Sequence, residues 1–171
     1  MQAYKKRGFW IGLAAFFFIL LTPNPESLSP IGWAVAAVTV LMAVRCMQMA
    51  TEGRPVDYIN AHGTSTPVGD MIELKGIREV FGNNVPPISS TKSLTGHSLG
   101  ATGVQEAVYS LLMMENNFMV ESANISNLDK EAEGMNIIRE NKNDVSINSI
   151  LSNSFGFGGT NASIYITRYN D

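Results

Sequence analysis

Two apolar runs open the chain, and a proline-rich turn separates them. The runs are residues 8–21 and 31–44, the turn is 22–30, a basic stretch at 5–7 precedes them and Arg45 follows. Each run is shorter than the roughly 20 apolar residues that span a bilayer. The pattern predicts a hydrophobic helical hairpin or two short spans, with both basic ends in the cytoplasm. It disfavours a secretory signal peptide, because no small-residue cleavage site follows the first run.

After residue 45 the pattern alternates between the strand and helix periods. A short strand at 56–60 leads to a helix with Thr66 as its N-cap and Pro67 at its first position, which Gly82 closes. A second strand at 88–92 leads to a longer helix ending near Asn116. This repeated strand–helix unit is typical of an α/β domain.

The remaining residues are expected to complete the same sheet. One short strand is indicated at 135–139, and two more follow at 145–151 and 162–168, joined by a glycine-rich turn. We therefore divide the chain into a hydrophobic segment, 1–44, and one α/β domain, 45–171.

The composition excludes several classes of protein. Hydrophobic residues make up 45% of the chain, which rules out a disordered protein. The formal net charge of -3 and the scattered Lys and Arg residues disfavour nucleic acid as a partner. Cys46 is the single cysteine, so an internal disulfide and a multi-cysteine metal site are both excluded. We expect a cytoplasmic protein, with membrane contact through residues 8–44 as the further possibility.

Both histidines fall where a predicted strand gives way to a predicted helix. His62 and His97 each lie beside glycine and hydroxyl residues. Strand ends are where open sheets place their sites. One histidine alone is more often structural, but two at equivalent corners favour a catalytic or binding role.

Three segments around these histidines carry a family resemblance. They read HGTSTPVGD at 62–70, TKSLTGHSLGA at 91–101 and SNSFGFGGTN at 152–161. In order and spacing they closely resemble the C-terminal motifs of the elongating β-ketoacyl-acyl-carrier-protein synthases, nearest the bacterial type I branch. The resemblance extends from about residue 45 to 171 and is more specific than a single glycine fingerprint.

The resemblance implies a thiolase-like fold, of which this chain would hold most of the second half as a mixed five-stranded sheet with helices. It implies fatty-acid elongation by decarboxylative Claisen condensation of malonyl-acyl-carrier-protein with an acyl thioester. The expected partner is acyl carrier protein, whose phosphopantetheine arm carries the substrates. No bound cofactor and no metal are expected.

The resemblance also assigns roles to four charged or titratable residues. His62 and His97 would donate hydrogen bonds to the malonyl thioester oxygen, where negative charge builds as the carboxylate leaves. Lys92 and Glu73 would pair and keep the histidines in their working protonation state. Without the motif, such a pair would be read as an ordinary salt bridge.

Two threonines and two phenylalanines complete the expected site. Thr64 and Thr66 match the hydroxyls that bind the pantetheine arm, although an isolated Thr-x-Thr is usually turn and cap chemistry. Phe157 would supply an oxyanion-hole amide and, with Phe155, gate the acyl pocket. The alternative for both phenylalanines is a simple hairpin connection.

The chain departs from the family in two respects. The nucleophilic cysteine belongs to the first half of the synthases, and Cys46 does not replace it, because its context matches an ordinary helix and a small buried hydrophobic side chain. Residues 1–44 resemble the first hydrophobic segments of a sodium-coupled divalent-anion symporter. The combination suggests a fusion joined near Val44.

Two rival interpretations follow from the same residues. The segment 96–100 fits the G-x-S-x-G nucleophile elbow of α/β-hydrolases, but no histidine follows Ser98 to complete a triad in that order. A non-catalytic fusion or decaying fragment with a membrane anchor stays open. On the enzyme interpretation, we expect no condensation by this chain alone, and we doubt that it forms the family's homodimer, which uses a strand of the first half.

Overall fold

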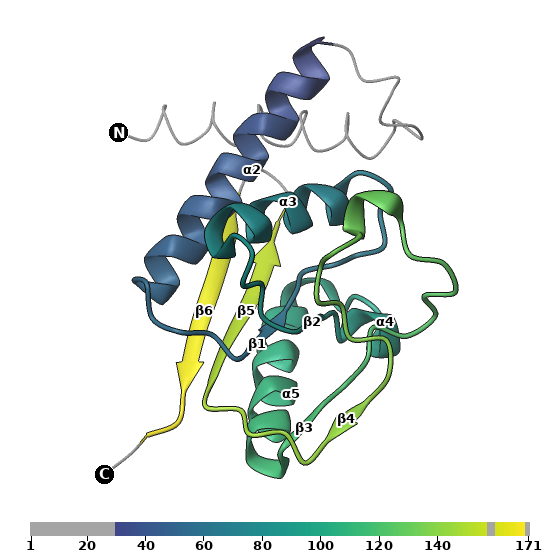
Figure 1. Ribbon diagram of the computed structural model, residues 1–171. Helices are drawn as coiled ribbons and strands as arrows, with labels where there is room; N and C mark the ends of the chain where they lie inside the picture. The colour runs from purple at the N-terminus through teal and green to yellow at the C-terminus, as the bar shows by residue number, and fades with distance from the viewer. Residues whose placement is uncertain (1–29, 157–159, 170–171) are drawn as a thin grey trace.

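The structure is a computed structural model that describes residues 30–156 and 160–169. The first apolar run and Phe157 lie outside the described residues. Figure 1 shows a main sheet with helices on both sides of it and a separate pair of short strands.

The sheet contains three parallel strands and one antiparallel edge strand. The strands are β1 (Tyr58–Asn60), β2 (Ile88–Ser89), β5 (Ser149–Phe155) and β6 (Asn161–Thr167), in the order β2-β1-β5-β6. β1 pairs in parallel with β2 and β5, and β5 pairs antiparallel with β6. The two long strands, β5 and β6, thus form a hairpin, and β1 lies between β2 and β5.

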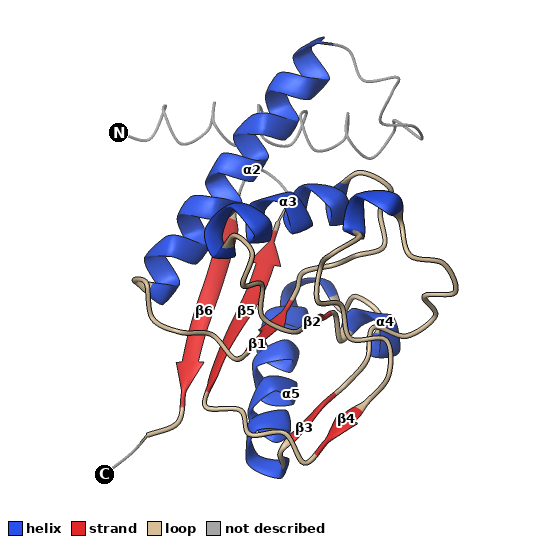
Figure 2. Ribbon diagram, viewed as in Figure 1, coloured by secondary structure: helices blue, strands red, loops and turns tan. Residues whose placement is uncertain are grey.

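The remaining elements connect these strands. They are α2 (Pro30–Thr51), α3 (Gly69–Phe81), α4 (Lys92–Thr95), α5 (Thr102–Asn116), the 3₁₀ turns η2 (Leu99–Ala101) and η3 (Lys130–Ala132), and the antiparallel pair β3 (Phe118–Met119) and β4 (Lys142–Asn143). Figure 2 separates them by type.

Two apolar clusters fix the layers, one on each face of the sheet. Ile59 and its neighbour Leu151 join Met47 of α2 and Ile77 of α3 in the first cluster. The adjacent pair, Tyr58 and Ile150, joins Met113 and Met114 of α5 in the second. Because successive strand residues point to opposite faces, α2 and α3 cover one face and α5 covers the other.

The second apolar run does not form a separate arm in this structure. α2 continues without a break through residues 44 and 45, and Ala43 and Val44 are buried. Over the described ranges, none of the helices is both long and apolar enough to cross a membrane. The division of the chain at residue 45 stays a prediction.

The expected fifth strand is wrong for the described residues, where the main sheet has four strands. Residues 135–139 contribute one parallel bridge, Ile137 to Ile88, and two backbone hydrogen bonds to Ile88. β2 has only two residues because the chain turns into α4 directly after it. A two-residue strand has too few free backbone N–H and C=O groups to form a β-ladder with residues 135–139.

Gly76 lies where α3 approaches α2. A Cβ added there would meet side-chain atoms of Met47, Val44 and Ala43 at 3.5–3.8 Å, ordinary contact distances. Because alanine is the better helix former, Gly76→Ala should raise the free energy of unfolding by about 1 kcal/mol. Urea unfolding measures it. Gly76→Leu should destabilise the protein, because the larger side chain overpacks the contact. Destabilisation by the alanine variant would contradict the described α2–α3 packing.

Candidate active site

The two histidines meet at one end of the parallel strands. His62 follows β1, and His97 lies between α4 and η2. Their ring centroids are 5.6 Å apart with the rings nearly perpendicular. Phe155, the last residue of β5, lies 5.9 Å from the His62 ring. The sequence-predicted residues His62, His97 and Phe155 therefore share one site, whereas the Phe157 prediction falls outside the described residues.

Glu73 supports the backbone at His62. Its two carboxylate oxygens accept the N–H groups of His62 and Gly63, each at 2.9 Å, and the Asn153 amide donates to the same carboxylate at 3.2 Å. Gly63 is required here: its φ is +27°, and a Cβ would come within 2.8 Å of the Ser90 Cβ. The buried Glu73 carboxylate thus fixes the backbone of the loop that carries His62.

The expected pairing of Lys92 with Glu73 is wrong. Lys92 Nζ donates to Glu106 Oε1 of α5, and both side chains are almost completely buried. Glu106 also accepts from the Ser154 hydroxyl at 3.4 Å. Glu73 is already engaged by three donors, so its oxygens have other partners.

Glu106 is the functional candidate that the sequence analysis missed. It is the only Asp, Glu, Lys or Arg between residues 93 and 114. A lone charge inside a long apolar helix requires a buried partner. The isolation of Glu106 in the sequence could therefore have identified it. Lys92, which immediately precedes this uncharged range, was the candidate for its partner.

Burial and a nearby cation keep both imidazoles neutral. Burial, the Lys92 ammonium and His97 together lower the pKa of His62 to about 3. The pKa of His97 is also lowered, by burial and then by Lys92. Burial raises the pKa of Glu106, and the Lys92 ammonium limits that rise.

The two rings differ in their hydrogen bonds. His97 Nδ1 lies 2.9 Å from the Thr102 hydroxyl at the start of α5. His62 Nδ1 is buried and has no hydrogen-bond partner among the residues that the structure describes. The Thr102 contact fixes the His97 ring through Nδ1 and leaves Nε2 available for a ligand.

Thr64 and Thr66 lie in the loop between His62 and α3. The Thr66 hydroxyl accepts a hydrogen bond from the Gly69 N–H at 3.2 Å. The backbone N–H of Thr66 donates to Asp70 Oδ1 at 3.3 Å. These hydrogen bonds close the turn that leads into α3. The helix begins at Gly69, two residues after the predicted first position Pro67, and its N-cap is Val68 rather than the predicted Thr66. Backbone groups of residues 64–66 also oppose the effect of burial, which raises the pKa of Asp70.

The family model "Beta-ketoacyl synthase, C-terminal domain" matches residues 31–126. 3-Oxoacyl-[acyl-carrier-protein] synthase 1 of Haemophilus influenzae is 55% identical over 141 residues, covering 81% of this chain and 35% of the relative. A solved structure of a type II PKS acyl-carrier protein in complex with its ketosynthase, bound to the hexaketide, matches with a TM-score of 0.72 and 29% identity, over 77% of this chain and 34% of that one.

The comparisons give no support to a symporter origin for residues 1–44. The family match already begins at residue 31. 3-Oxoacyl-[acyl-carrier-protein] synthase 2 of Coxiella burnetii is 42% identical over 162 residues, which cover 94% of this chain and 37% of the relative. Since the chain has 171 residues, that match must extend well into the apolar opening.

The depressed pKa of His62 predicts how stability changes with pH. The pKa of this imidazole is about 3 in the folded protein against an ordinary 6.5. Below pH 6.5 the unfolded chain binds a proton that the folded chain does not, so stability falls as the pH falls. His62→Gln should reduce the stability loss between pH 7 and 5 by about 2 kcal/mol, at about 1.4 kcal/mol per pKa unit.

Urea unfolding of both proteins at the two pH values measures this difference. Asp70, Glu73 and Glu106, whose pKa values are also shifted, are present in both proteins, so most of their contribution cancels. Equal pH dependence in the two proteins would mean that His62 is not held neutral.

Proposed function

This chain belongs to the β-ketoacyl synthase family, as its C-terminal domain, and on that premise we propose that it carries the malonyl-handling side of a decarboxylative condensation. The observation that supports the proposal is the pair of imidazoles, whose ring centroids lie 5.6 Å apart, together with the buried Lys92–Glu106 pair. The chain spans about a third of the length of the curated relatives it matches.

In the proposed step, the bond between the malonyl carboxylate and the α-carbon breaks and carbon dioxide leaves. The electron pair passes to the thioester oxygen, which becomes an enolate. Two positioned N–H donors stabilise that oxygen more than the starting thioester, and this difference lowers the barrier. In the required tautomer of His97, the Thr102 hydroxyl donates to Nδ1 and Nε2 carries the hydrogen.

Neutral imidazoles suit this step better than charged ones. An imidazolium would form an ion pair with the malonyl carboxylate and stabilise the group that must leave. Lys92 opposes imidazolium formation electrostatically, and Glu106 balances the buried ammonium. Lys92 and Glu106 are therefore proposed as positioning residues, in place of the Lys92–Glu73 pair.

The substrate contacts belong to the same proposal. Thr64 and Thr66 line the loop beside His62 and are proposed to bind a phosphopantetheine arm. Phe155 and Phe157 are proposed to gate access to the pocket that holds the acyl group. Acyl carrier protein is the proposed partner, supported by the relatives' names and by the ketosynthase–carrier-protein complex among the structural matches.

Condensation also needs a thiolate that accepts the acyl group. Cys46, the only cysteine in the sequence, lies within α2, on the sheet face opposite α5. We propose that the nucleophile comes from the part of the synthase that the curated relatives have in addition to this region.

Lys92→Met should move the acid limb of malonyl decarboxylation to higher pH. Lys92 lowers the pKa values of both His62 and His97, so its removal lets the imidazoles protonate at a higher pH. Carbon dioxide release from malonyl-acyl-carrier-protein, measured from pH 5 to 8, gives the profile. Lys75→Met is the matched control, because Lys75 forms an exposed pair with Glu131 on the surface. An unshifted profile in Lys92→Met would remove Lys92 from the mechanism.

The whole chain should give no β-ketoacyl product when supplied with acyl- and malonyl-carrier proteins. Product should appear when the remaining, cysteine-bearing part of the Haemophilus relative is added as a second polypeptide. The whole chain is used because α2 supplies Met47 to the core. Product from this chain alone would show that the acyl group does not need an external thiolate.

A further inference from the structure

Asn60 is the last residue of β1 and lies two residues before His62. It is completely buried. Because alternate strand residues share one face of a sheet, Asn60 points to the same side as Tyr58, the side that α5 covers. The amide of a buried asparagine contains donors and an acceptor, and all of them need partners. The partners of Asn60 lie in the two segments that carry the buried ion pair.

The amide oxygen of Asn60 holds the start of α4. Oδ1 accepts a hydrogen bond from the Thr91 backbone N–H at 3.3 Å, and the Thr91 hydroxyl lies 3.3 Å from both Oδ1 and Nδ2. Thr91 is the residue directly before Lys92, and α4 has only four residues. So short a helix is not stable by itself, and its first N–H groups have no acceptor within the helix. Asn60 supplies such an acceptor.

The amide nitrogen of Asn60 contacts α5. Nδ2 donates to the backbone oxygen of Glu106 at 3.5 Å and to the hydroxyl of Ser110 at 3.4 Å. Glu106 and Ser110 are four residues apart and therefore share one face of the helix. The orientation of the amide follows from its partners, because the Thr91 N–H can only donate and the Glu106 C=O can only accept. One planar group thus joins the residue before Lys92 to the backbone of Glu106.

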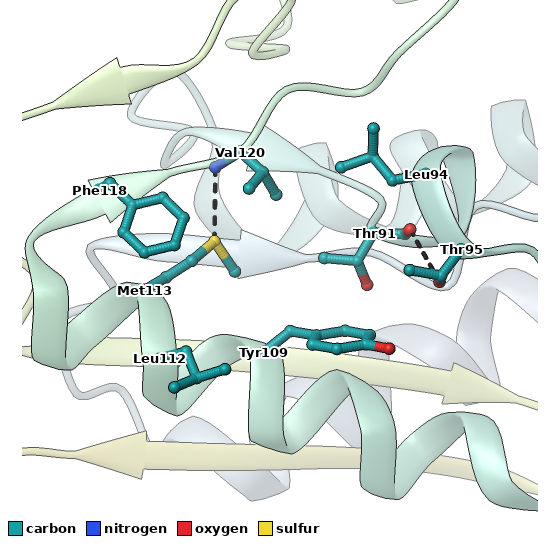
Figure 3. A pocket seen from close by; sticks show the side chains of 8 residues that line it. All are labelled: Thr91, Leu94, Thr95, Tyr109, Leu112, Met113, Phe118 and Val120. Carbon is teal, nitrogen blue, oxygen red and sulfur yellow. Dashed lines mark hydrogen bonds between the residues drawn. The ribbon is translucent and has the colours of Figure 1, made fainter.

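A pocket separates the α4 segment from part of α5. Figure 3 shows Thr91, Leu94 and Thr95 on the α4 side of this pocket and Tyr109 and Leu112 on the α5 side. Its volume is about 140 Å³. Within the part of the chain that the structure describes, side-chain packing along this pocket does not fix the distance between the two helices. Buried polar contacts beside it take over that role.

We propose that Asn60 is a positioning residue, which holds the Lys92–Glu106 ion pair in place against the two imidazoles. The two ends of the pair belong to different helices, and the amide of Asn60 hydrogen-bonds backbone groups at both of them. The strand that ends in Asn60 leads directly into the loop that carries His62. One buried side chain therefore connects the three segments. The catalytic meaning of this role rests on the proposed function, whereas the contacts themselves do not.

The position of the ion pair matters because the energy between charges depends on their separation and is large away from water. After the effect of burial, the Lys92 ammonium lowers the pKa values of both imidazoles. The other charged groups of the site are Glu106, which pairs with Lys92, and two carboxylates of α3, Asp70 and Glu73. Without the amide of Asn60, α4 is free to shift relative to α5. The effect of the ammonium on the imidazoles then weakens.

NMR titration of the imidazole C–H signals, on the whole chain between pH 4 and 8, tests this role without requiring activity. The chain has two histidines, so a His62→Gln variant assigns both signals. In Asn60→Ala the pKa of His97 should rise toward its ordinary 6.5, and by less than in Lys92→Met. In a Lys92→Met background, Asn60→Ala should cause no further rise, because Asn60 acts through Lys92.

Tyr58→Phe is the matched control. Tyr58 lies on the same strand and the same face, is completely buried, and shares a hydrogen bond of 2.7 Å with the Ser89 hydroxyl. This variant should lower the free energy of unfolding and leave the pKa of His97 unchanged. If Asn60→Ala does not fold, Ser110→Ala decides, because it removes one partner of the amide and alanine favours the helix. It should raise the pKa of His97 by a smaller amount.

Carbon dioxide release from malonyl-acyl-carrier-protein, measured on the same variants, separates this role from the proposed function. A His97 pKa that rises in Asn60→Ala together with the acid limb of release supports both. If the pKa rises while release is absent or its profile stays fixed, Asn60 keeps its positioning role and the proposed function fails. An unchanged His97 pKa in folded Asn60→Ala overturns the positioning role. So does a rise that adds in full to that of Lys92→Met, or an unchanged pKa in Ser110→Ala where Asn60→Ala does not fold.

Discussion

The buried ion pair between Lys92 and Glu106 connects the elements on which the candidate site depends. Lys92 begins α4 and Glu106 lies in α5, so the pair ties the two helices that precede and follow His97. Taking two charges out of water costs several kcal/mol per ion, and their attraction often does no more than offset that cost. Such a pair is poorly explained as a contribution to stability. Burial and then the Lys92 ammonium lower the pKa values of both imidazoles, and this effect of its lysine explains the pair better.

Glu73, a second buried carboxylate in the site, has a different role. Among the residues that the structure describes, Glu73 pairs with no ammonium, and it accepts backbone N–H groups from His62 and Gly63. Hydrogen bonds of this kind satisfy a buried charge and fix a loop at the same time. The site therefore uses one carboxylate to balance a cation and another to hold the backbone. The two environments explain why exchanging the roles of Glu73 and Glu106 would leave a buried charge without its partner.

Sequence reasoning located the histidines because both lie in motif segments at the ends of strand–helix units, a position that chain order alone reveals. It failed on the partner of Lys92, because the choice between Glu73 and Glu106 depends on which helix covers which face of the sheet. That choice follows from the alternation of Ile59 and Tyr58 between the two apolar clusters. Propensity likewise predicted five residues for β2, whereas the turn into α4 begins at Ser90, so the strand has only two. The comparisons do not support the transporter resemblance of the apolar opening, and a short hydrophobic run carries little information about family.

The outer side of α5 and the segment before it expose six large apolar side chains, the α5 face, namely Leu94, Leu99, Val104, Val108, Leu111 and Leu112. Both faces of the sheet are covered by clusters that contain fully buried side chains, such as Leu151 on one side and Ile150 on the other. None of the six residues of the α5 face belongs to either cluster. Large apolar side chains that lie outside both clusters are typical of a surface that packs against further protein. His97 lies between α4 and α5 next to this face, so whatever covers α5 also changes the solvent around the candidate site.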